Sequence, residues 1–423
     1  MMERRREPVP ESTSLIASIG FVLYCAFVLS GFANDWSLRL FGTKAYVSAV
    51  TLILVPLAWI FSRNALRGLR SSIGVCWAAF LMWMLLATPL SVWRGGSVGM
   101  LANYIPRAYL EFFYTCAFVT SIHRCRQWMY VQIASGAALL VSCAALGSMG
   151  DDPAGGRFRI PNSLFYANSN DLALALLLAM ASFLFLFHRP GCIRRTAGVA
   201  GILIAASYMF RTGSRGGVIA AFTLLALMLV VSRGRWKIAA FGLAALGIAL
   251  AGSPNALHRL SLVMGGPPSQ GETESDLASV ASQVQREELF KTSLRYTLGH
   301  PLFGVGPDQF AAAVNEEAER TGEHIAWLGT HNTYTQVSSE CGIPGLIFYL
   351  AVIFLCLGSN FRLYRRTRDD TDLSDVAALS QCLLAGTVVF AVSAFFFHMA
   401  YGAYLPALAG FTVALHSAAE LPE

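Results

Sequence analysis

Two arginines in a short turn are the first candidates for chemistry. Arg211 and Arg215 flank the sequence Thr-Gly-Ser, and two glycines follow, between two apolar runs. Ser214 is a preferred N-cap residue, so we expect a helix to begin after it, with free N–H groups and a positive dipole end beside the arginines. Guanidinium groups bind phosphate oxygens bidentately, and the turn therefore indicates a diphosphate site. It lacks the Gly-Lys-Ser/Thr of nucleotide loops, which argues against a nucleoside triphosphate. The alternative interpretation is an interfacial arginine pair that extends to lipid head groups.

His331 is the candidate for a general base. It stands beside Asn332 at the expected start of a helix that becomes apolar, and Glu340 follows on the same helix. The dipole at a helix N-terminus disfavours the imidazolium, so the ring stays a base near neutral pH. Three other histidines lack this position and are interpreted as structural: His300, His324 and His398.

Two further groups have competing interpretations. Asn168 and Asn170 precede an apolar run. Either Asp171 caps the helix of this run and the asparagines are loop residues, or the asparagines bind substrate. Arg107 and Glu111 lie four residues apart within another apolar run. Charges inside a membrane span are costly and mark functional sites, and the alternative is that the two side chains form a structural ion pair.

The chain as a whole is typical of a multi-span membrane protein. Hydrophobic residues make up 55% of its 423 residues and charged residues 13%, whereas soluble domains are about a quarter charged. Runs of bilayer-crossing length, roughly 17–25 residues, occur at 14–32, 45–62, 73–93, 101–121, 128–148, 171–188, 196–210, 216–232, 236–252, 335–358, 377–397 and 401–417. We therefore predict an all-α polytopic fold with about 12 transmembrane helices. The predicted parts are transmembrane helices (1–252), a long helical extracytoplasmic loop (253–334) and further transmembrane helices (335–423).

Basic residues set the expected orientation. Eighteen of the 31 basic residues fall on alternate connections: Arg4, Arg5, Arg6, Arg63, Arg67, Arg70, Arg124, Arg126, Arg189, Arg194, Arg195, Arg233, Arg235, Lys237, Arg362, Arg365, Arg366 and Arg368. The positive-inside rule then predicts that both termini are cytoplasmic. We expect this multi-pass protein in the inner (plasma) membrane. The same parity puts Arg211–Gly217 and the long loop outside.

The long loop is acidic and helical. From Ser253 to His331 it holds five bases and ten acids, which argues against nucleic acid as a partner. Its spacing predicts one helix over 282–298 and a second from Pro307 to a terminating Gly322. The chain shows no metal-ligand spacing and no paired framework among its nine cysteines, so we expect neither a metal nor another cofactor.

Four motifs together resemble the O-antigen ligase superfamily, which includes lipopolysaccharide O-antigen ligases and related polysaccharide polymerases. They are Asn168–Ala173, Thr212–Gly217, His300–Gly306, and His331-Asn332 followed by Glu340–Gly345. The likeness covers about residues 160–360. It departs at Ser169, where the family often has proline.

The resemblance implies an inverting, metal-independent transfer of a glycan from a polyprenyl-diphosphate donor to a hydroxyl of a lipid or glycan acceptor. Arg215 matches the family's short-loop arginine, Arg286 is similar in placement to its long-loop arginine, and His331 matches its histidine. By this likeness the arginines would hold the diphosphate and stabilise the leaving group, and His331 would orient or deprotonate the acceptor. We expect further substrate contacts from Arg211, Ser214, Asn168, Asn170, Asn332 and Glu340.

Two alternatives stay open. A polymerase would use the same donor to extend a like chain. A transporter for lipid-linked glycan would place charged or broken-helix features near mid-membrane in paired halves. Here the polar motifs cluster on one face, and the two halves show no correspondence.

The alternation of basic connections generates a topology test. A tag inserted within 265–280 should be labelled from outside intact cells, whereas a tag within 365–370 should be protected until the cells are opened. Labelling of both tags from one side would contradict the predicted spans.

Overall fold

The structure, a computed structural model, describes residues 15–43, 47–62, 64–150, 156–163, 165–232, 242, 274–322 and 327–419. Within these ranges the chain is almost wholly helical, with one two-stranded antiparallel sheet. The elements are α1 (Leu15–Phe41), α2 (Val47–Ile60), η1 (Arg67–Arg70), α3 (Ser72–Ala87), η2 (Thr88–Leu90), α4 (Arg94–Tyr104), η3 (Ile105–Tyr109), α5 (Glu111–Phe118), α6 (Ile122–Leu146), β1 (Ser148–Met149), β2 (Phe158–Arg159), α7 (Ser169–Phe187), α8 (Cys192–Arg211), α9 (Arg215–Val231), α12 (Glu274–Gly299), α13 (Phe310–Thr321), α14 (Thr333–Thr367), α15 (Ser374–Ser393) and α16 (Tyr404–Ala419).

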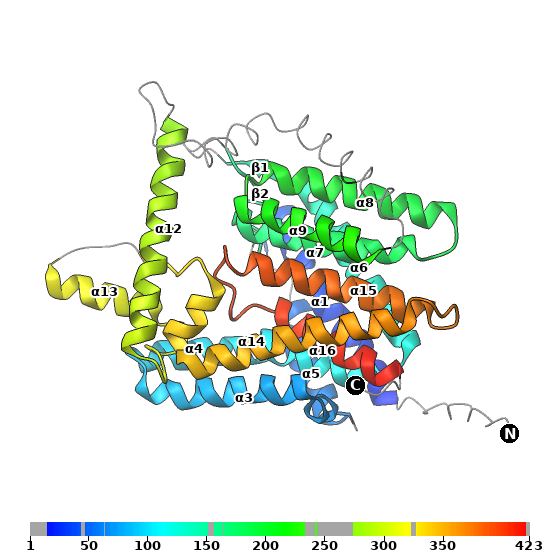
Figure 1. The fold of residues 1–423 in the computed structure, drawn as a ribbon, viewed down its shortest axis with the longest axis horizontal. Coiled ribbons are helices and arrows are strands. Elements are labelled where there is room, and N and C mark those ends of the chain that lie inside the picture. The colour runs from blue at the N-terminus through cyan, green and yellow to red at the C-terminus, as the bar shows by residue number, and fades with distance from the viewer. Residues whose placement is uncertain are drawn as a thin grey trace.

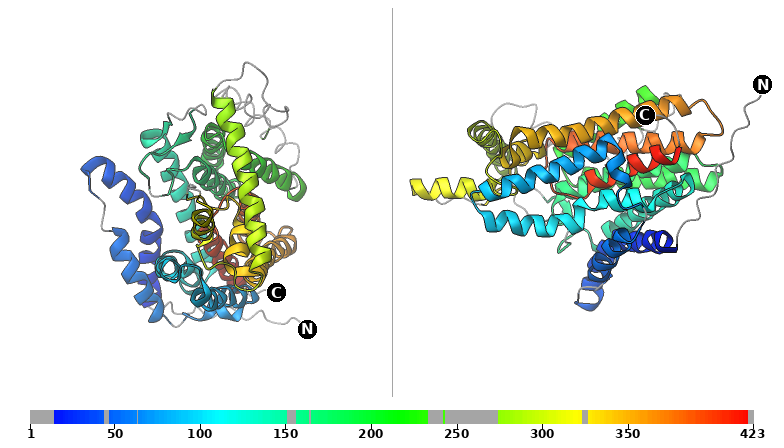
Figure 2. Two further views of the ribbon diagram at one scale, coloured as in Figure 1. Left: turned by 90° about the vertical axis from the view of Figure 1, so that its left-hand side faces the viewer. Right: turned by 90° about the horizontal axis from the view of Figure 1, so that it is seen from below.

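Most of the helices run side by side along the long axis of the molecule (Figure 1). The most buried of the apolar helices are α7 and α15, with 67% and 83% of their membrane-length windows inside the protein. The α1–α2 pair packs along one side of the bundle, and α12 crosses one end of it (Figure 2). The polar segment that contains Arg286 therefore covers a single end of the bundle.

The described helices confirm the all-α class but not the predicted number of spans. Six of them are long and apolar enough to cross a membrane, and three shorter apolar helices accompany them. The predicted run at 236–252 lies outside the described residues, apart from residue 242. The run at 196–210 forms α8, which is not among the six. The division of the chain at 252 and 334 stays a prediction.

The predicted run at 101–121 is interrupted. α4 passes into the π-helical turn η3 before α5 begins. Pro106 has no N–H to donate, so the regular hydrogen-bond ladder cannot continue through it. The amide of Leu110 instead donates to the carbonyl of Ile105, 3.0 Å away, which is the wider spacing of a π-turn.

This turn separates Arg107 from Glu111. The Arg107 side chain is exposed, whereas Glu111 is buried, and no ion pair joins the two in the described chain. The hydroxyl of Tyr24 instead donates to Glu111 Oε1 over 3.3 Å. The interpretation as a structural ion pair is therefore wrong, because the π-turn shifts the helical phase on which it depended.

Several connections that were predicted to lie on the same side of the membrane contact each other at the end of the bundle away from α12. Arg126 on α6 pairs with Asp375 at the start of α15 over 3.0 Å, and Arg189 after α7 pairs with the same carboxylate. These two ion pairs bring together three connections that carry basic residues, as their predicted alternation requires.

The two helices predicted within residues 253–334 differ from their expected bounds. α12 begins at Glu274, before the predicted 282, and ends at Gly299. α13 begins at Phe310 rather than Pro307, because the amides of Asp308 and Phe310 donate to the carboxylate of Glu340. Gly322 terminates α13 as predicted, in a left-handed conformation with φ of 77°.

α14 is broken near its N-terminal end at Gly342. The residue has φ of 73° and ψ of −179°, a conformation open only to glycine. A Cβ on Gly342 would lie 2.0 Å from the carbonyl oxygen of Leu302, so the segment before α13 passes directly against the break. Pro344 follows, and since proline has no N–H, the carbonyl of Glu340 is left without its helical donor.

The segment Pro301–Gly306 replaces the hydrogen bonds that the break removes. Ile343 N–H donates to the carbonyl of Pro301 over 2.7 Å. Three carbonyls of the broken turn accept from outside the helix: those of Ser339, Glu340 and Cys341, from Val305 N–H at 2.8 Å, Gly306 N–H at 3.0 Å and the Trp83 indole at 2.9 Å. These three carbonyls therefore all have donors, and the hydrogen bonds join the 301–306 segment to the first part of α14.

Substitution of Gly342 should destabilise the fold. In Gly342→Ala the Cβ meets both a positive φ and the Leu302 carbonyl, so we expect a loss of at least about 1–2 kcal/mol. Gly358→Ala is the matched control on the same helix, because a Cβ there meets nothing within 4 Å, and it should be neutral or slightly stabilising. Thermal unfolding in detergent measures both; equal unfolding temperatures would contradict the role of the break.

Candidate functional site

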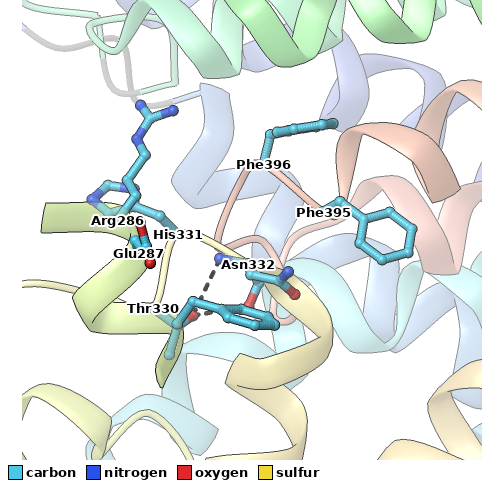
Figure 3. A pocket seen from close by; sticks show the side chains of 8 residues that line it. Arg286, Glu287, Thr330, His331, Asn332, Phe395 and Phe396 are labelled. Atoms are coloured by element: carbon cyan, nitrogen blue, oxygen red, sulfur yellow. Dashed lines mark hydrogen bonds between the residues drawn. The ribbon is translucent and has the colours of Figure 1, made fainter. Parts of the chain in front are cut away.

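A cavity of about 210 Å³ lies where α12, the start of α14 and the segment after α15 meet. Figure 3 shows Arg286 and Glu287 from α12 together with His331 on one side, opposite Phe395 and Phe396, and Asn332 between them. The remaining lining residues are Phe290, Thr330 and Asn332. The cavity combines cationic, imidazole and aromatic groups at one end of the bundle.

His331 lies just before the N-terminus of α14, in a constrained backbone conformation. Asn332 is the N-cap, and its side-chain oxygen accepts from the amides of Tyr334 and Thr335 at 2.9 and 3.1 Å. His331 immediately precedes this cap with φ of 51°, a left-handed conformation that is uncommon for residues other than glycine. The predicted placement of His331 at a helix N-terminus is confirmed, and Asn332 forms the cap beside it.

The surroundings of His331 keep its imidazole neutral. Burial, the neighbouring His398 and the positive charge of Arg286 together lower the pKa of His331 to about 4, and burial is the largest of the three causes. A neutral imidazole at physiological pH can accept a proton, which is what a general base requires.

Arg286 lines this cavity, and Arg215 lies near enough to it for the two charges to interact. Burial lowers the pKa of Arg286, and the charge of Arg215 adds to the effect. Arg286 forms no ion pair within the described chain. Two neighbouring guanidinium groups, one of them partly buried, make an environment that favours a bound anion.

Arg215 is the first residue of α9, and α9 begins beside the cavity wall. Ser214 is the N-cap of α9, as predicted, and its hydroxyl accepts from Gly217 N–H over 3.2 Å. Gly216 lies so close to Phe396 of the cavity wall that a Cβ would stand 2.5 Å from the Phe396 Cβ. Glycine here lets the N-terminus of α9 abut the wall.

The other predicted substrate contacts have structural partners away from the cavity lining. Arg211 stacks on Phe158 and Tyr208, with its guanidinium carbon 5.0 and 5.8 Å from the ring centroids. Asn168 caps α7 by accepting from Asn170 N–H over 2.8 Å, so Asn168 has the capping role that was expected of Asp171.

Arg157 is a connecting residue that the sequence did not indicate. Its Nη2 donates to the side-chain oxygen of Asn170 over 2.6 Å, and its Nε donates to the carbonyl of Thr212 over 2.9 Å. It therefore ties the asparagine motif to the turn that carries Arg215. Its position before β2, far from either motif in sequence, gave no local signal for this role.

Glu340 is not among the residues that line the cavity, and it lies at the break in α14. Its Oε2 accepts from the Tyr401 hydroxyl at 2.7 Å and from the Asp308 amide at 3.1 Å. The carboxylate thereby fixes the start of the α13 segment and the approach to α16. These contacts give Glu340 a role in holding the site together.

His398 stands next to His331, although the sequence placed it among the structural histidines. The two ring centroids are 5.1 Å apart with an interplanar angle of 81°. A signal was present in the sequence: the alternation of basic connections puts the segment after 397 on the same side as His331.

Comparison with known proteins agrees with this geometry. Residues 200–350 match the family model for O-antigen ligase. This segment belongs to the O-antigen ligase superfamily. The O-antigen ligase segment includes Arg215, Arg286 and His331, whereas His398 lies beyond it. Curated proteins yield no match to the chain.

The apolar helices are those of an integral membrane protein, and the matched segment is similar to polysaccharide ligases and polymerases. Among the described residues, no group of three or more His, Cys, Asp or Glu side chains could hold a metal ion. The charged side chains that line the cavity are those of Arg286 and Glu287.

Proposed function

We propose that this protein is a metal-independent, inverting glycosyltransferase that moves a glycan from a polyprenyl-diphosphate donor to an acceptor hydroxyl. The observation that carries the proposal is that Arg286 and a neutral His331 line one cavity, with Arg215 near enough to Arg286 to lower its pKa. Its setting is the outer face of the inner membrane, with both chain termini in the cytoplasm. The donor enters from the outer leaflet, and no cofactor takes part.

The two arginines hold the diphosphate. Their guanidinium groups bind its oxygens and neutralise the charge that develops when the bond between the anomeric carbon and the phosphate oxygen breaks. An anion placed between them also relieves their mutual repulsion. The helix N-terminus that begins at Arg215 contributes its positive dipole in the same direction.

His331 activates the acceptor. Its neutral imidazole accepts the proton of the acceptor hydroxyl as that oxygen forms its bond to the anomeric carbon. Attack on the face opposite the diphosphate inverts the configuration at this carbon. The diphosphate leaves on the polyprenyl lipid.

The position of the cavity favours this reaction over transport. A transporter binds its cargo near mid-membrane between paired halves, whereas this cavity lies under α12 at one end of the bundle. Ligation and polymerisation use the same donor chemistry and differ only in whether a lipid or a growing glycan carries the acceptor hydroxyl. Supplying both acceptors to the purified protein with one donor distinguishes them.

Lysine at position 215 tests the diphosphate role. An ammonium is a point charge and cannot form the bidentate contact, so Arg215→Lys should lose much of the activity that Arg215→Ala loses. Arg320→Lys is the control, because Arg320 is an exposed residue of α13 that pairs with Glu316. Transfer is measured per folded molecule; near-normal activity of Arg215→Lys would favour an interfacial arginine.

Substitution of His331 tests the base. His331→Ala should lower turnover by roughly 10²–10⁴-fold while donor binding persists, because the arginines hold the diphosphate. His331→Gln, which cannot take the proton, should be as inactive as alanine. Since the neutral ring is the active form and its pKa is about 4, wild-type kcat/KM should stay level down to about pH 5 and fall below it. Normal turnover of either variant would exclude His331 as the base.

A further inference from the structure

His398 lies in the 394–403 segment between α15 and α16, and its backbone is fixed on both sides. The hydroxyl of Thr333 donates to the carbonyl of Phe397 over 2.7 Å and accepts from Met399 N–H at 3.0 Å. Thr333 N–H also donates to the carbonyl of Ala394 over 2.8 Å. Thr333 is the first residue of α14, two positions after His331. The two histidines are therefore carried by backbones that are bonded to each other.

The His398 side chain is exposed and makes two contacts. Its ring meets the His331 ring edge to face. It also packs near Gly329, where a Cβ would lie 3.1 Å from the His398 ring. No hydrogen bond joins the two imidazoles in the described chain. The contact is therefore one of packing and electrostatics, and it passes no proton from ring to ring.

We propose that His398 is a positioning residue that holds the His331 imidazole in the orientation and the neutral form needed to accept the acceptor proton. This inference rests on the proposed role of His331 as a base. Edge-to-face contact restricts rotation of the His331 ring.

The charges around His331 define what His398 contributes. Arg286 and Glu287 face the cavity from α12, Arg215 approaches from α9, and His398 faces it from the segment after α15. Burial lowers the pKa of His398 as well, so both rings are neutral at physiological pH. Protonation of one ring disfavours protonation of the other, because the two positive charges repel each other. Removing His398 therefore raises the pKa of His331 toward its ordinary value.

The test compares two substitutions of His398. In His398→Ala the ring contact is lost, so kcat/KM at neutral pH should fall about tenfold through misorientation of the base. The acid limb of its pH profile should also move to higher pH. His398→Phe keeps an aromatic edge-to-face partner, so it should recover most of the rate. A purely structural role of His398 would leave the pH profile in place.

The double variant His331→Ala/His398→Ala completes the test. If His398 acts through His331, the double variant should be no less active than His331→Ala alone. A further loss in the double variant, or an unchanged rate and pH profile in His398→Ala, would overturn the positioning role. His300→Ala is the control, because His300 is exposed and stacks on Tyr296 outside the cavity lining.

The outcomes separate this inference from the proposed function. If His331→Ala is active, the base assignment fails and the positioning role fails with it. If His331→Ala is inactive while His398→Ala behaves as wild type, only the positioning role fails. Unfolding temperatures of all the variants identify any loss that comes from misfolding.

Discussion

The break in α14 at Gly342 is the constraint on which the rest of the site depends. A helix that stops hydrogen bonding inside a membrane leaves carbonyls that cost several kcal/mol each if nothing else bonds to them. The 301–306 segment and Trp83 supply those hydrogen bonds, and they thereby connect the 301–306 segment to the N-terminal part of α14. Because the first turns of α14 are fixed in this way, His331 stands at one defined place next to α12.

The electrostatics of the cavity follow from that placement. Burial and nearby positive charge keep His331 unprotonated, and the same positive charge comes from the residues suited to bind a diphosphate. One arrangement therefore accounts for both a base and an anion site. The segment between α15 and α16 completes it, since Phe396 packs against the start of α9 and His398 packs against His331.

Local sequence signals predicted the features that depend on neighbouring residues. The cap at Ser214 and the terminator at Gly322 are confirmed, because N-caps and left-handed C-caps depend on residue type at one position. The ion pair of Arg107 and Glu111 was wrong because a π-turn changed the helical phase. The bonds of Arg157, the place of Glu340 at the break and the contact of His398 link segments far apart in sequence. Periodicity and spacing carry no information about such pairs, and for the same reason the number of spans could not be settled from run lengths.

The most direct measurement is a structure of the protein with a non-transferable polyprenyl-diphosphate glycan analogue bound in lipid nanodiscs. The account predicts that the diphosphate lies between the guanidinium groups of Arg215 and Arg286, with the anomeric carbon facing the cavity that His331 lines. A diphosphate bound elsewhere, with these two arginines making no contact to its oxygens, would contradict it.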